Sequence, residues 1–458
     1  MSDPADRRLL SRARSLIAPA DREKAQAALA RTLEDDSSGE LAALLTDEPR
    51  AKTLLLGVLG CSPYLADLAQ RDPDRLARLL ANVPETSLHS LLARAKDPSP
   101  DTEAAVMRHL RLLKQEAALL VALADLAKVW DTMTAARALT EFADAALEAA
   151  VAFTLREASI AGKLELFDQR MPARGSGYIV IGMGKQGAYE LNYSSDIDLI
   201  VFFDRSRARP TKPDEDTELY VRLTQRVVKI MSERTADGYV FRTDLRLRPD
   251  ASATPIALPL EAAYAYYESI AQNWERAAFI KARAVAGDLA AGEEFLKNLT
   301  PFVYRKYFDF AAIADVHAIK RQIHAHKGHG AIAVNGHDVK LGRGGIREIE
   351  FFAQTQQLLA GGRNPQLRQR ATLDALRELA AGGWVEPATR DELTEAYLFL
   401  RDVEHRIQMV ADAQTHSLPK DDAGVAAIAC MMGFPDRESF AQALRRRLEC
   451  VQGHYARL

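Results

Sequence analysis

The sequence predicts an α+β fold that is mostly helical, with one short α/β block between helical regions. Three observations predict it. Apolar residues recur at helical spacing before residue 162, β-rich runs alternate with glycine turns over residues 178–248, and helical patterns return from residue 261. Apolar residues spaced by three and four indicate amphipathic helices, whereas short runs rich in β-branched and aromatic residues indicate strands.

The N-terminal region is predicted to form successive helices. Ser62 followed by Pro63 marks a helix start, because serine caps free backbone N–H groups and proline fits the first helical position. Helical apolar spacing continues along residues 106–123, and a further helix is expected over residues 134–161. We therefore expect a helical region over residues 1–130.

The α/β block begins after residue 174 and belongs to a domain that we place at residues 131–300. Its elements follow from the β-rich runs, the glycine turns and the amphipathic spacing. We expect strands at residues 178–181, 197–203 and 239–248, a short helical piece at 186–192, a loop at 205–216 and a helix at 219–234. Beyond the block, Lys281 and Arg283 follow Trp274 at helical spacing.

The third region, residues 301–458, is predicted to be helical apart from one hairpin. Asn335-Gly336 lies between two short apolar-bearing arms in residues 332–341, and Asn-Gly is a preferred turn of two-residue hairpins. The glycine-rich segment 342–345 then opens a helix that we expect over residues 346–359.

The composition excludes several classes of protein. The chain has 458 residues, with 60 basic and 63 acidic side chains and a net charge of −3, whereas nucleic-acid binding favours a basic excess. The longest apolar stretch, near residues 117–126, is too short for a membrane span. Its three cysteines are sparse and form no CxxC motif, which is typical of a reducing cytosol. We expect a cytoplasmic protein that binds neither nucleic acid nor membrane.

Two carboxylates lie two residues apart in the second predicted strand. Because a strand alternates its faces, Asp196 and Asp198 project from the same side. Asp244 is the candidate third carboxylate, since its strand belongs to the same block. Carboxylate oxygens suit Mg²⁺ bound together with substrate phosphates. The alternative is a charged, solvated strand face.

Candidate phosphate-binding groups surround these carboxylates. The turn Gly182-Met183-Gly184-Lys185-Gln186-Gly187 follows a strand and precedes a helix start, where backbone N–H groups favour anions. A tight turn without a ligand is an equal alternative. Arg246 and Arg248 share the expected face of Asp244. Two further basic clusters, at residues 274–283 and 340–347, either bind phosphate or pair with acidic neighbours. The histidines at 317, 324, 326, 329 and 337 are expected in a solvated segment rather than at a metal.

Four ordered motifs resemble those of bacterial glutamine synthetase adenylyltransferase/adenylyl-removing enzymes. They are GMGKQGAYELNYSSDIDL (182–199), DLRLRP (244–249), WER with KAR (274–283) and GRGGIREIEF (342–351). The resemblance implies a DNA-polymerase-beta-like nucleotidyltransferase domain with a small mixed sheet, flanked by helical domains. The family commonly has Lys-Leu-Gly-Gly where this chain has Lys185-Gln186-Gly187-Ala188, and we expect the fold to tolerate that difference.

The resemblance also implies a reaction. That family looks like two such units in tandem, whereas this chain has one carboxylate segment. The residues of this segment and the long helical region before it resemble the N-terminal, adenylyl-removing unit. The chain is therefore compatible with one half of a longer enzyme. The implied activity is phosphorolysis of AMP-tyrosine on adenylylated glutamine synthetase, which consumes inorganic phosphate and releases ADP. The alternatives are ATP-dependent adenylylation of glutamine synthetase, and a non-catalytic module that binds glutamine synthetase or the PII signal protein.

The resemblance assigns roles to individual residues as well. Asp196, Asp198 and Asp244 would be catalytic and would hold Mg²⁺ or Mn²⁺. The groups expected to bind phosphate oxygens are Gly184, Lys185, Gly187, Ser195, Arg246, Arg248, Lys281 and Arg283. PII protein would be the regulator, with ATP and ADP as nucleotides.

Overall fold

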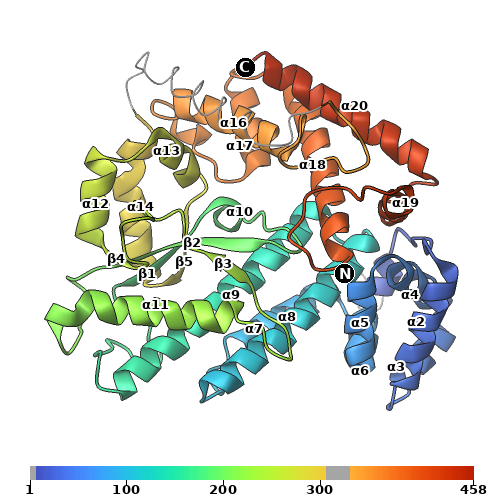
Figure 1. Ribbon diagram of the computed structural model, residues 1–458, viewed down its shortest axis with the longest axis horizontal. Coiled ribbons are helices and arrows are strands. Elements are labelled where there is room, and N and C mark those ends of the chain that lie inside the picture. Colours follow the sequence, from blue (N-terminus) through green and yellow to red (C-terminus); the bar gives the residue numbers. More distant parts are fainter. Residues whose placement is uncertain (1–6, 306–330) are drawn as a thin grey trace.

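The computed structural model describes residues 7–305 and 331–458, and Figure 1 shows long helices around one small sheet. This architecture confirms the predicted α+β, mostly helical class. Within the described ranges, no helix combines the length and the apolar character that crossing a membrane requires. The histidine predictions at residues 317, 324, 326 and 329 lie outside the described residues.

Helices make up the N-terminal region, as predicted. Their starts follow the capping residues in the sequence: the Ser62 side chain accepts a hydrogen bond from the Leu65 N–H at 3.0 Å, and Thr102 and Asp131 cap the two longest helices of this region. The bounds are α1 Leu9–Arg12, α2 Arg22–Glu34, α3 Glu40–Asp47, α4 Pro49–Cys61, α5 Pro63–Arg71, α6 Pro73–Ala81, α7 Pro84–Ala95, α8 Glu103–Leu126 and α9 Thr132–Ile160.

A mixed sheet of five strands follows. Its order is β3-β2-β1-β5, with β4 also paired to β2. The pairs β1–β2 and β1–β5 are antiparallel, whereas β2–β3 and β2–β4 are parallel. The strands are β1 Tyr178–Gly182, β2 Asp196–Phe203, β3 Arg242–Asp244, β4 Leu258–Pro259 and β5 Arg283–Gly287, and the helices among them are α10 Gly184–Gly187, α11 Asp216–Ser232, α12 Leu260–Ser269, α13 Asn273–Phe279 and α14 Leu289–Val303.

Helices cover both faces of the sheet, which explains why β1 and the part of β2 after Asp198 are apolar and buried (Figure 1). On one face, Ile179, Ile181 and Phe202 pack with α12 and α14. On the other, Tyr178 and Phe203 each stack on Tyr220 of α11, with ring centroids 6.0 and 4.5 Å apart. The carboxylate end of β2 is the part of this strand that stays half-buried.

The C-terminal helices pack back onto the N-terminal ones. Arg406 of α18 donates two hydrogen bonds of 2.6 Å to Asp125 of α8, and both side chains are fully buried. This buried ion pair holds α18 against α8. The bounds are α16 Ile346–Ala360, α17 Thr372–Ala381, α18 Pro387–Met409, α19 Asp422–Met431 and α20 Arg437–Ala456.

The predicted hairpin at residues 332–341 is wrong. The Asn335-Gly336 turn forms, with Gly336 at a φ of +72°, but its two arms do not pair with each other. Instead the segment lies beside residues 416–419: the Gly336 N–H donates to the Pro419 carbonyl and the Leu418 N–H donates to the His337 carbonyl. A tertiary partner therefore replaces the local one.

Three predicted element bounds also need correction. The strand expected at residues 239–248 forms only over β3, Arg242–Asp244, because the Asp244 side chain accepts the Arg246 N–H and turns the chain. Arg246 and Arg248 are therefore not on a strand face shared with Asp244. The helix expected to carry Trp274 through Arg283 ends at Phe279, and Arg283 begins β5. The helical piece expected at residues 186–192 is the single turn α10.

Candidate active site

Three carboxylates meet at one edge of the sheet. Asp196 and Asp198 start β2, and the parallel register places Asp198 directly opposite Asp244 of β3. One oxygen of each carboxylate lies within 4.8 Å of the others. Ile197, between the two aspartates, is fully buried on the opposite face. Strand alternation therefore creates the pair, and parallel pairing adds the third member.

The electrostatics of this cluster are unfavourable without a cation. Burial, reinforced by the charges of Asp196 and Asp244, raises the pKa of Asp198 to about 6. Asp244 behaves differently, because hydrogen bonds from Arg246, one of them 2.8 Å long, lower its pKa. Two neighbouring carboxylates thus have different proton affinities, and the more buried one lies in the centre of the cluster.

The glycine turn before β2 contacts this cluster. The Met183 N–H donates to the Asp198 carbonyl at 2.8 Å, which ties the turn to the strand. Gly184 has a φ of +52°, and a Cβ there would lie 3.3 Å from a carboxylate oxygen of Asp198. Glycine is therefore needed for the backbone conformation, and it leaves space beside the carboxylate.

Lys185 reaches across to the C-terminal helices. Its Nζ donates to Glu404 of α18 at 2.9 Å, and His416 lies 2.8 Å from the same carboxylate. Burial lowers the pKa of Lys185 to about 7, against the opposing effect of Glu404. The Lys185 ammonium thus lines the site while a residue 219 positions away holds it.

A cavity of about 310 Å³ opens beside the carboxylates. Lys340 and Arg347 line it with Asp196 and Asp198. Within the described residues, neither of these two cations has an ion-pair partner, so both are available to an anionic substrate. Aromatic and small side chains complete the walls. The lining residues are Gly184, Lys185, Ser195, Asp196, Asp198, Leu247, Trp274, Ala277, Ala278, Lys281, Lys340, Arg347, Glu350, Phe351 and Gln354.

Lys281 has a different role from the one expected. It forms part of the wall, but its Nζ donates to Glu190 at 2.7 Å, to Glu350 at 2.6 Å and to Thr372 at 3.1 Å. A lysine ammonium has three donors, so all of them are used within the protein. Lys281, which precedes β5, is therefore a buried link to Glu190, α16 and α17 rather than a free phosphate ligand.

Unlike Lys281, the expected ligands Arg283, Arg248 and Gly187 do not line the cavity. Arg283 pairs with Asp144 at 2.7 Å and donates to the Gln186 carbonyl, so it supports the glycine turn from behind. Arg248 donates to backbone carbonyls of residues 245–255. At Gly187, a Cβ would lie 1.7 Å from the Lys281 carbonyl oxygen, so this glycine permits close packing of α10 against the chain before β5.

The remaining predicted residues are brought together. Gly184, Lys185 and Ser195 line the cavity, and the highly exposed Arg246 pairs with Asp244 of the carboxylate cluster. Sequence reasoning missed Glu404 and His416, and it left open whether Lys340 and Arg347 bind phosphate or pair with acids. The spacing of charged residues along α18 does not indicate that Glu404 would pair with Lys185 of the glycine turn.

The donor set of the carboxylate cluster fits a hard divalent cation. All three candidate ligands offer oxygen atoms within a short distance of one another, and Mg²⁺ and Mn²⁺ prefer carboxylate oxygens and phosphates. Burial raises the pKa of Asp198 and repulsion from Asp196 and Asp244 adds to it, and such a cation would relieve this repulsion.

Known proteins resemble this chain over most of its length. Residues 52–298, which include the whole sheet, match the family described as glutamate-ammonia ligase adenylyltransferase, and residues 317–458 match the family described as GlnD PII-uridylyltransferase. Over 435 residues the chain is 55% identical to the bifunctional glutamine synthetase adenylyltransferase/adenylyl-removing enzyme of Agrobacterium fabrum. Identity to the enzymes of the same name is 54% in Xanthobacter autotrophicus and 53% in Rhizobium meliloti.

These alignments cover 93%, 96% and 96% of this chain but 44%, 45% and 46% of the relatives. The chain thus spans about half the length of the curated relatives that it matches. The resemblance drawn from the four motifs is confirmed. This chain belongs to the glutamate-ammonia ligase adenylyltransferase family.

Proposed function

We propose that this chain is a nucleotidyltransferase that removes AMP from an adenylylated tyrosine of glutamine synthetase by phosphorolysis, with ADP as the product. The observation that carries the proposal is the three-carboxylate cluster beside a cavity lined by Lys340 and Arg347, which have no ion-pair partner in the described part of the chain. The relatives' printed name includes an adenylyl-removing activity. A DNA-polymerase-beta-like fold for residues 131–300, PII protein as regulator and a cytoplasmic location belong to the same proposal.

The three carboxylates would hold Mg²⁺ or Mn²⁺, which supplies charge neutralisation at the phosphoryl oxygens when bound. Lys340 and Arg347 then bind the remaining negative charge of AMP and of the attacking phosphate. Lys185 donates from the other side of the cavity, held by Glu404. Trp274 and Phe351 give the cavity an aromatic wall that suits a nucleotide base.

The chemistry requires little proton transfer. An oxygen of inorganic phosphate attacks the AMP phosphorus, the bond from phosphorus to the tyrosine oxygen breaks, and the phenolate leaves with the electron pair and takes a proton from water. Phenol has a pKa of about 10, so it leaves without a strong general acid. This agrees with a cavity whose described lining residues include carboxylates and cations but not histidine.

The test is a deadenylylation assay. Purified chain is mixed with adenylylated glutamine synthetase, inorganic phosphate and Mg²⁺, and ADP release is followed with and without PII protein. We expect ADP to form, and Asp196→Asn to reduce its rate by at least about 100-fold, since one metal ligand is lost. Asp214→Asn, an exposed aspartate outside the cavity, is the matched control and should leave the rate unchanged.

Adenylylation is the alternative direction, because it uses the same carboxylates. The same chain is therefore also mixed with unmodified glutamine synthetase and ATP. AMP incorporation without any ADP release from the adenylylated substrate would refute the proposed direction. Binding of glutamine synthetase or PII with neither reaction would favour a non-catalytic module.

A further inference from the structure

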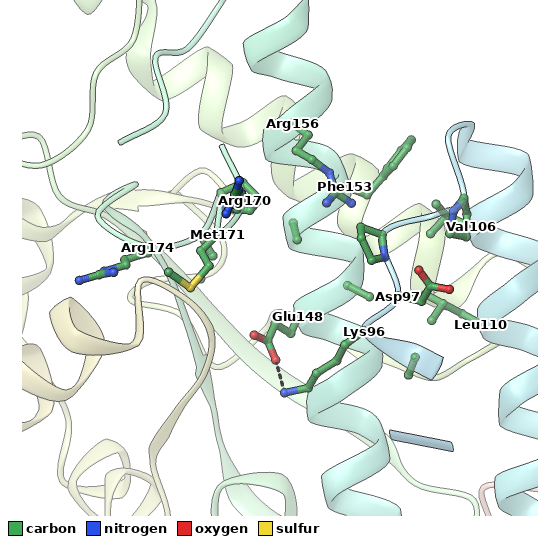
Figure 2. Close-up of a pocket in the computed structure, with 18 of the residues that line it drawn as sticks. Lys96, Asp97, Val106, Leu110, Glu148, Phe153, Arg156, Arg170, Met171 and Arg174 are labelled. Carbon is green, nitrogen blue, oxygen red and sulfur yellow. Dashed lines mark ion pairs between the residues drawn. The ribbon is translucent and has the colours of Figure 1, made fainter. Parts of the chain in front are cut away.

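A second cavity lies apart from the carboxylate site. It measures about 440 Å³ and lies between the α7–α8 connection, α9, the loop at residues 170–174 and the start of α14 (Figure 2). It shares no lining residue with the cavity at the carboxylates. The two cavities also flank different ends of β5, since Gly287 closes this strand at the second cavity. The two cavities are therefore separate.

The interior of this cavity is apolar. Val106, Leu110 and Phe153 form part of its lining and are buried. Two larger apolar side chains of the lining remain open to solvent, since Met171 is 49% exposed and Leu289 is 46% exposed. Side chains of this kind gain free energy when an apolar group covers them. The lining thus favours a ligand with an apolar body.

The acidic groups of the lining already have partners. Glu148 pairs with Lys96 at 2.8 Å, the ion pair drawn in Figure 2. Asp97 accepts the Ser99 N–H at 3.0 Å, and Asp288 accepts the Ala291 N–H at the start of α14. Each carboxylate is therefore engaged by a lysine or by backbone donors.

The arginines of the lining are different. Arg156, Arg170 and Arg174 line the same cavity, and none of them has an ion-pair partner among residues 7–305 and 331–458. Figure 2 shows Arg156 on its helix and Arg170 on the neighbouring loop, both above the Lys96–Glu148 pair in this view, whereas Arg174 points away from the other labelled side chains. Arg156 and Arg170 thus give the lining uncompensated positive charge.

We propose that this cavity binds a small organic anion with an apolar body, its acidic group held by Arg156 and Arg170. Guanidinium groups bind carboxylate, sulfonate and phosphate oxygens through paired hydrogen bonds. A volume of 440 Å³ lies within the range of about 300–1,000 Å³ typical of small-molecule sites. The apolar lining supplies burial, and the arginines select for negative charge.

A matched pair of fluorescent probes tests both features. Anilinonaphthalenesulfonate has an aromatic body and one sulfonate, and phenylnaphthylamine is its uncharged analogue. Each is titrated into the full chain while its emission is followed. We expect saturable binding of the sulfonate probe, and we expect the double variant Arg156→Gln/Arg170→Gln to weaken it by at least about ten-fold, as the loss of charge-assisted hydrogen bonds implies. Affinity for the uncharged probe should change less than about two-fold, because its binding rests on the retained apolar lining.

Arg446→Gln is the control, because Arg446 is an exposed arginine on α20, which does not line the cavity. It should leave both titrations unchanged. Because Arg170 is exposed and Arg156 is half-buried, the double variant should fold, and an unchanged circular dichroism spectrum and melting temperature confirm that it does. Equal weakening of both probes, or sulfonate binding that the double variant does not change, would overturn the proposal.

Discussion

Replacement of Asp198 by asparagine should stabilise the metal-free chain and remove its response to Mg²⁺. One oxygen of each carboxylate lies within 4.8 Å of the others, and two unit charges at that distance repel by about 3 kcal/mol at an effective dielectric constant of about 20. Asp198 has two such neighbours, and Lys185 and Lys340 offset part of the repulsion. Asparagine keeps the shape without the charge, so we expect a gain of about 1–3 kcal/mol in the free energy of unfolding.

The assay is urea unfolding followed by tryptophan fluorescence, at pH 8 with EDTA and again with Mg²⁺. A cation that binds only the folded chain stabilises it by about 2.7 kcal/mol when its concentration is about 100 times Kd. The natural chain should therefore gain stability from Mg²⁺, whereas Asp198→Asn should gain little. Asp214→Asn is again the matched control.

Two results would refute this reasoning. Loss of stability in metal-free Asp198→Asn would mean that the carboxylate is held by favourable contacts rather than strained by its neighbours. Equal stabilisation of both chains by Mg²⁺ would place the cation at another site.

Three further changes have defined outcomes. Gly187→Ala should cost about 3 kcal/mol of unfolding free energy, because its Cβ would overlap the Lys281 carbonyl, whereas Gly453→Ala, with open space around it, should cost little in the same denaturation experiment. Although burial opposes it, the charge of Lys281 lowers the pKa of Glu350 from 4.5 to about 2. The stability that this ionised carboxylate contributes is therefore complete above pH 4.5 and is lost as the pH falls through about 2. The free energy of unfolding of the natural chain should exceed that of Glu350→Gln by an amount that shrinks as the pH falls through this range. A difference that stays constant with pH would contradict this pKa of Glu350. Glu404→Gln should lower the pKa of Lys185 below its value of about 7, because the charge of Glu404 raises it. In the deadenylylation assay, KM for phosphate should therefore rise about ten-fold at pH 8 and less at pH 6. An equal rise at both pH values would argue against a role for the Lys185 charge.

The candidate site divides into residues that local patterns predict and residues that they do not. Asp196 and Asp198 follow from strand alternation, and Gly184 from its turn. Asp244 was expected from an alternating strand that proved to be three residues long. Its position opposite Asp198 comes from parallel pairing of β2 with β3, so Asp244 lies beside the other two carboxylates for a different reason than the one expected.

The sequence by itself determined the α+β class, the helix starts at capping residues and the family motifs, because each depends on residues within a few positions of one another. Only the tertiary structure decided which cations are free to bind substrate. Lys281 and Arg283 belong to the motifs, yet Glu190, Glu350 and Asp144 engage them. Arg347 of the fourth motif and Lys340, which lies just before that motif, line the cavity without an ion-pair partner among the described residues. Ion pairing depends on the spatial distance between side chains that are far apart in the sequence, and spacing along the sequence does not determine that distance.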